Sequence, residues 1–157
     1  MEVKDRKDID VKDTWNLESI YANNELWEEE YAALEKEAEE FAKLKGAIEA
    51  DVSKIPVVLD AYYGLHRCLS KLSVYARMRS DQDTTDSTYQ TMSAKIGSLG
   101  VKIGAASAFV EPEILSYSKE QLEAAEKENE RTAYYGRKIE EMLRGQPRHR
   151  QYQNQYG

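Results

Sequence analysis

The residues that could perform chemistry are few and far apart. The chain has two histidines, His66 and His149, and a single cysteine, Cys68. A zinc site needs several His, Cys or carboxylate ligands at suitable spacing. His66 has no second His or Cys at a ligand spacing, and Arg148 and Arg150 beside His149 would disfavour a cation. No histidine is placed by sequence to activate the cysteine, so we expect an inert thiol packed on a helix. The sequence therefore offers no catalytic group and no metal ligand set.

Three aspartates at short spacing, Asp81, Asp83 and Asp86, could in principle surround a calcium ion. An EF-hand loop counted from Asp81 needs glycine at its sixth position and glutamate at its twelfth, where this chain has Asp86 and Met92. We interpret the run instead as a solvated loop between two helices, with one member capping the next helix.

Composition limits the classes of partner and setting. The chain of 157 residues is 41% hydrophobic and 32% charged, with a net charge of −7. An acidic surface of this kind argues against nucleic acid as a partner. No stretch approaches the run of apolar residues that a membrane helix needs, so we expect no membrane contact. One cysteine excludes an internal disulfide, and we expect a cytoplasmic protein.

Apolar residues at alternating steps of four and three predict the first two helices. We expect one over residues 25–45, capped by Asn24 and ended by Gly46 in a left-handed conformation. A second helix should begin at a Ser53 cap and end near Ser80.

A third helix should follow the polar loop at residues 81–86, with Thr85 or Asp86 as its cap. Its apolar stripe keeps a seven-residue spacing from Tyr89 to Val110, and Pro112 should stop or kink it.

The last quarter of the chain predicts two more helices. Ser118 and Gln121 form a capping-box pattern at the start of the fourth helix. A break near Asn129 should separate it from a fifth helix at about residues 131–144. No strand-like alternation is present, so we expect an all-α fold, an antiparallel helical bundle with long helical hairpins.

A second stripe in the third helix consists only of small residues. These are Ser93, Gly97, Gly100, Gly104 and Ser107. Glycine inside a helix costs roughly 1 kcal/mol relative to alanine, so another backbone packed closely against this stripe would offset the loss. The stripe is a candidate helix-packing or domain-interface surface. Its partner could be another helix of the same domain or a part of the protein outside this chain.

Three phrases in order carry a resemblance to a known family. They are TWNLESIY at residues 14–21, VYARMRSDQDTTD at residues 74–86 and EPEIL at residues 111–115. Together they resemble the amino-terminal helical domain of oligoendopeptidase F, a zinc metallopeptidase family. The resemblance extends to RGQPRH at residues 144–149, which is similar to an Arg-x-x-Pro-His segment of the family.

The resemblance implies a metalloendopeptidase that acts on short peptides and holds zinc in a downstream His-Glu-x-x-His helix. This chain has no such motif, so we expect it to bind no catalytic zinc and to be inactive alone. The implied partners are the missing catalytic domain and, in the full-length protein, an oligopeptide substrate.

These observations give a prediction of domains and role. We expect a flexible N-terminus at residues 1–13, the family-like helical domain at residues 14–145, and a disordered tail at residues 146–157 from truncation or a frameshift. The predicted role is the substrate-channel domain of a cytoplasmic zinc oligopeptidase. The alternative is a free-standing helical interaction module derived from that domain.

Overall fold

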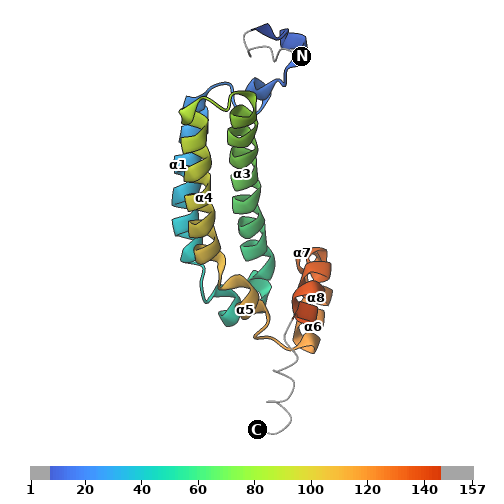
Figure 1. The fold of residues 1–157 in the computed structure, drawn as a ribbon. Coiled ribbons are helices and arrows are strands. Elements are labelled where there is room, and N and C mark those ends of the chain that lie inside the picture. Colours follow the sequence, from blue (N-terminus) through green and yellow to red (C-terminus); the bar gives the residue numbers. More distant parts are fainter. Residues whose placement is uncertain (1–7, 146–157) are drawn as a thin grey trace. The chain divides into compact units, whose positions relative to one another are not determined.

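The computed structural model describes residues 8–145, and every regular element in that range is a helix (Figure 1). This confirms the all-α prediction. The chain divides into two compact units. The first contains residues up to 40 and residues 63–106, and the second contains residues 41–62 and residues from 107 onward. None of the described helices is long and apolar enough to cross a membrane.

The first unit is built from parts of three long helices. These are α1 (Asn24–Ala42), α3 (Ile55–Gln82) and α4 (Ser87–Ser107), preceded by the short 3₁₀ turns η2 (Val11–Asp13) and η3 (Leu17–Ser19). Figure 1 shows that α3 runs opposite to α1 and that α4 runs opposite to α3. This arrangement agrees with the predicted antiparallel hairpins.

The core of this unit lies where the apolar stripes of the three helices meet. Its fully buried members include Trp27, Leu34, Leu72, Tyr75 and Leu99. The indole Nε1 of Trp27 donates a hydrogen bond to the carbonyl oxygen of Leu72 over 2.9 Å. A buried indole N–H therefore has a partner, which removes the penalty of desolvating it.

The second unit contains short helices. These are α2 (Ala47–Ala50), η4 (Val52–Lys54), α5 (Val110–Ile114), α6 (Lys119–Glu128), α7 (Glu130–Tyr134) and α8 (Gly136–Gly145). Phe41 stacks on Phe109 with ring centroids 5.5 Å apart. The Tyr117 hydroxyl donates to the carbonyl oxygen of Ile48 over 2.8 Å, which ties the segment after α5 to α2.

Several predicted helix ends are confirmed. Ser118 and Gln121 form the predicted capping box at α6. Gly46 has φ 90°, the left-handed conformation predicted for it, but α1 ends earlier than predicted, at Ala42, and Gly46 directly precedes α2. The Asp86 carboxylate accepts from the N–H of Thr88 over 2.8 Å, so Asp86 caps α4.

Two predicted caps are wrong by one or two residues. Asn23 rather than Asn24 caps α1, since its side chain accepts from the N–H of Leu26 over 2.9 Å. Two adjacent asparagines are equally suitable caps by sequence, and Asn24 instead accepts from a tyrosine hydroxyl of α3. Asp51 rather than Ser53 begins the second helical segment, because an extra 3₁₀ turn precedes α3.

Two predictions about the later helices also need correction. The third helix ends at Ser107, and Pro112 lies inside the short α5, where a first-turn proline loses no hydrogen bond. The predicted fifth helix is two helices, α7 and α8, with Tyr135 at the break between them. The predicted break near Asn129 is confirmed, and its side chain caps α7.

The terminal predictions remain largely outside the structure. Residues 1–7 and the predicted tail at residues 146–157 lie outside the described residues. Residues 8–13 are exposed and include the single turn η2.

Candidate functional site

The residues with catalytic side chains do not assemble into a site. Within residues 8–145, no group of three or more His, Cys, Asp or Glu side chains could hold a metal ion. His66 is half-buried on α3, and His149 lies outside the described residues. Cys68 is also half-buried on α3, which agrees with the prediction of a thiol packed on a helix.

The aspartate run uses its oxygens to shape its own loop. Asp83 accepts from the backbone N–H and the hydroxyl of Thr85, over 3.0 and 2.6 Å. The side-chain hydrogen bond, with the backbone one, lowers the pKa of Asp83. Asp86 caps α4, so two of the three carboxylates accept hydrogen bonds from nearby backbone N–H groups. This agrees with the interpretation of the run as a loop that caps the next helix.

The thiol of Cys68 lies against a carboxylate. Its Sγ is 3.3 Å from Oε1 of Glu30, and Oε2 of the same carboxylate accepts from Nζ of Lys71 over 2.9 Å. Burial, and then the hydrogen bond and negative charge of Glu30, raise the pKa of Cys68 to about 12. A thiol in this environment is protonated at neutral pH and is a poor nucleophile.

We expect Cys68 to react with Ellman's reagent at pH 8 at least about 100-fold more slowly in the folded chain than in urea. Replacing the neighbouring carboxylate, Glu30→Gln, should lower the thiol pKa and speed the reaction. A folded-state rate equal to the rate in urea would show that Cys68 is not protected.

The structure places the predicted small-residue stripe mostly on an open helix face. Ser93, Gly97 and Gly104 are exposed, and Ser107 is buried. A Cβ built at Gly97 or Gly104 would meet no atom within 4 Å, and one at Gly100 would lie 3.8 Å from Cδ2 of Leu69. Of the three glycines, Gly100 is therefore the one at which an added Cβ would contact a side chain of another helix.

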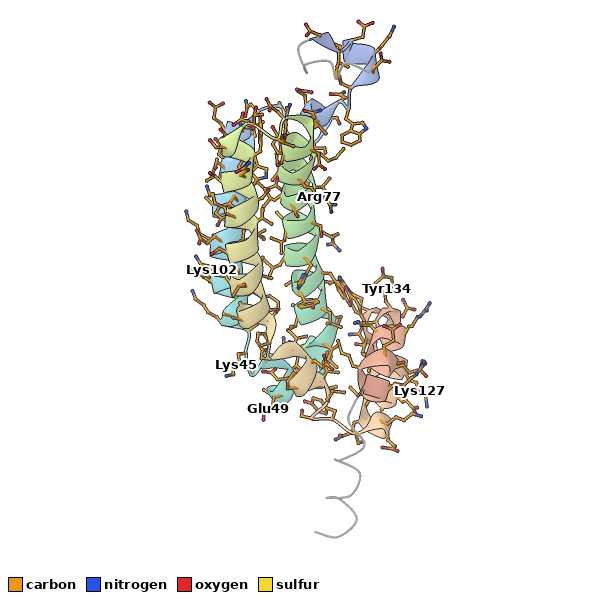
Figure 2. All side chains as sticks on the ribbon, in the orientation of Figure 1. Lys45, Glu49, Arg77, Lys102, Lys127 and Tyr134 are labelled. Atoms are coloured by element: carbon orange, nitrogen blue, oxygen red, sulfur yellow. The ribbon has the colours of Figure 1, made fainter. Side chains whose placement is uncertain are left out.

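The exposed part of the stripe continues into a wider uncharged surface. Its exposed members are Ser93, Ala94, Gly97, Ser98, Val101, Gly104 and Ala105, which we call the α4 small face. Val101 at its centre is 75% exposed. The two charged residues of α4, Lys95 and Lys102, pair with Glu28 and Glu35 on α1 (Figure 2 labels Lys102). The sequence pattern indicated the stripe but gave no sign that Val101 is exposed.

The first two phrases of the family resemblance contact each other in the first unit. Arg79 donates to the carboxylate of Glu18 over 2.9 Å. Tyr21 meets Tyr75 edge to face, with ring centroids 5.2 Å apart. These residues hold the segment before α1 against the end of α3, so both phrases have a structural role.

The third phrase also has a structural role, and sequence reasoning missed it. Glu113 is 7% exposed. Its carboxylate accepts from the backbone N–H groups of Gly46 at 2.5 Å, Ile48 at 3.2 Å and Glu49 at 3.4 Å. The one sequence signal was an acidic residue in a mainly apolar stretch, and its partners are more than sixty residues away in the chain.

The fold and these contacts define a helical scaffold whose described residues carry no metal-ligating group. Comparison with known proteins finds relatives that are much longer than this chain. The chain is 33% identical over 146 residues to Oligopeptidase PepF of Bacillus subtilis (strain 168), covering 93% of the chain and 22% of that protein. It is 34% identical over 118 residues to the plasmid-encoded Oligoendopeptidase F of Lactococcus lactis subsp. cremoris, covering 74% and 20%.

A third relative is Group B oligopeptidase PepB of Streptococcus agalactiae, 33% identical over 114 residues, covering 73% of the chain and 19% of that protein. These matches confirm the resemblance that the three phrases predicted, and the chain is related to the oligoendopeptidase F family. It spans about a fifth of the length of these relatives. No family model and no solved structure matches the chain.

Proposed function

We propose that this chain is the substrate-channel domain of a cytoplasmic zinc-dependent oligopeptidase and is not catalytic by itself. The relatives are oligopeptidases by name, and the chain matches only a fraction of each. The observation that carries the proposal is the role of the three shared phrases, which hold helices and loops together rather than form a reactive site. A domain of this kind contributes the shape of a channel, and the chemistry comes from elsewhere.

The residues described here do not fit a catalytic zinc ion. Such an ion takes three protein ligands and leaves a fourth position for water. Cys68 is held protonated beside Glu30, and within residues 8–145 no group of three or more His, Cys, Asp or Glu side chains could hold a metal ion. In the proposed enzyme, zinc would therefore be held by residues outside this chain.

A peptidase assay with added zinc tests this part of the proposal. Purified chain should release no product from a fluorogenic oligopeptide, and dialysis should remove all added zinc. Zinc-dependent turnover that copurifies with the chain would refute the proposal.

We propose further that the α4 small face is where the rest of the enzyme packs. Each helical glycine costs about 1 kcal/mol relative to alanine. An added Cβ at Gly97 or Gly104 would meet no atom within 4 Å, so this face leaves room for a close approach from outside. Small residues let a second helix approach closely, and the exposed Val101 would be buried by it.

Alanine substitutions should show how much these glycines lower the stability of the isolated chain. In the isolated chain, Gly97→Ala and Gly104→Ala should each raise the free energy of unfolding by about 0.5–1 kcal/mol, because nothing obstructs the added methyl. Gly46→Ala is the matched control and should lower it, because φ 90° strains any residue with a Cβ. Urea titration measures all three. If Gly97→Ala and Gly104→Ala instead lower the stability, another part of the chain already packs closely on these glycines.

The second candidate function is a free-standing helical interaction module. It is favoured by the core of the first unit, because residues of this chain are sufficient to bury Trp27, Leu72 and Leu99 completely. Such a module should be monodisperse and melt cooperatively. A scaffold that lacks its partner should instead bind an apolar dye or self-associate through the α4 small face, and Val101→Lys should abolish both effects.

A further inference from the structure

One flank of the first unit joins an acidic stripe of α1 to a basic stripe of α3. Glu30 of α1 pairs with Lys71 of α3 at 2.9 Å, so the two stripes meet along this flank. Residues spaced by three and four positions along a helix share one face. The exposed members are Leu26, Glu29, Ala33 and Glu37 on α1, and Arg67, Lys71 and Val74 on α3, which we call the α1–α3 flank.

The apolar members of the two stripes lie at similar heights along the helices. The hydrogen bond from Trp27 to the carbonyl of Leu72 fixes the register of α1 against α3. Because the two helices are antiparallel, each step forward along α1 corresponds to one step back along α3 (Figure 1). Leu26 therefore lies close to the height of Val74. These side chains are 44% and 47% exposed, so neither is covered within its own chain.

Several charges of the flank have no ion-pair partner. Among residues 8–145, no ion pair involves Glu29, Glu37 or Arg67. By the same register, Arg67 lies close to the height of Ala33, one helical turn from Glu37. Glu37 is on the side of α1 that faces α3, since its charge contributes to the raised pKa of Cys68. The flank thus presents unpaired charges of both signs at neighbouring heights.

A second copy turned by 180° about an axis parallel to the helices would match this flank. The rotation leaves every residue at its height and places α1 of each copy opposite α3 of the other. Leu26 would then face Val74 of the other copy, and Arg67 would reach Glu37 of the other copy across the small side chain of Ala33. A two-fold axis across the helices would instead place the acidic α1 stripes against each other, and these would repel.

We propose that a second copy of this chain docks on the α1–α3 flank, with acidic α1 against basic α3. Charge complementarity selects this partner, because the flank itself carries the charges that match it in number of stripes and in height. Contact would also remove Leu26 and Val74 from water. The proposal is independent of the proposed function, since the α4 small face lies on another helix and stays free.

Sedimentation equilibrium of the full chain tests the proposal, and we expect a dimer. Arg67→Glu and Glu37→Arg should each weaken the dimer at least about tenfold, because each substitution places like charges opposite each other. An equimolar mixture of these two variants should recover the dimer, since each introduced charge then meets its opposite. Lys127→Glu, a charge reversal at an exposed position of α6, is the matched control and should leave the dimer unchanged.

A second variant distinguishes this dimer from association through the α4 small face. The dimer should survive Val101→Lys, and circular dichroism should show that every variant is folded. The proposal would be overturned by a chain that stays monomeric at about 1 mM. It would also be overturned if Val101→Lys removed the dimer while Arg67→Glu did not, or if the mixture of the two charge-reversed variants stayed monomeric.

Discussion

Replacing Trp27 by alanine should lower the free energy of unfolding by about 3–5 kcal/mol, the range for a buried aromatic residue. Trp27 has no exposed surface. Its ring stacks on Tyr31 at 5.4 Å, and its N–H binds the carbonyl of Leu72. The substitution removes the largest side chain of the core, and urea unfolding followed by circular dichroism measures the loss.

The other tryptophan is a matched control for this prediction. Trp15 is 58% exposed, so Trp15→Ala should change stability by no more than about 0.5–1 kcal/mol. Trp27→Phe should fall between the two, because it keeps a ring and loses the N–H. Equal effects of Trp15→Ala and Trp27→Ala would contradict the core described for the first unit.

Replacing Glu113 by alanine should have the second largest effect, a loss of about 2–4 kcal/mol. Three backbone N–H groups would lose a charged acceptor, and hydrogen bonds to charged groups contribute about 1.5–3 kcal/mol. Ile48 is completely buried, so water could not easily replace the lost acceptor of its N–H. Hydrogen exchange should show the loss first as faster exchange at residues 46–49.

Glu111 is the control, since it lies in the same short helix and is exposed. Glu111→Ala should be nearly neutral. Glu113→Gln should cost less than Glu113→Ala because one amide oxygen can still accept. If Glu113→Ala leaves exchange at residues 46–49 unchanged, the carboxylate does not hold that turn.

Local sequence signals predicted those parts of the fold whose causes are local. The capping box at Ser118 and the left-handed Gly46 depend on residues within a few positions of each other, and both predictions are confirmed. Which of Asn23 and Asn24 caps α1 could not be predicted from neighbouring residues. It depends on the hydroxyl of Tyr75, 51 residues from Asn24 in sequence, which donates a hydrogen bond to the Asn24 side chain.

The candidate site was predictable only in part. The spacing of Gly97, Gly100 and Gly104 located a face without side chains, but periodicity cannot say which helix lies opposite. The structure shows that, of these three glycines, Gly100 is the one at which an added Cβ would contact a side chain of another helix. The split of one expected helix into α7 and α8 was not predicted from the sequence either.

A chimera with the Bacillus subtilis relative tests the central claim most directly. The relative should lose zinc-dependent cleavage of a fluorogenic oligopeptide when its matched segment is deleted, and regain it when this chain replaces that segment. Gly97→Leu in the chimera should prevent recovery, since a large side chain would block packing on the α4 small face. The account would be contradicted if this chain alone cleaved the peptide with zinc, or if the deleted relative were equally active without it.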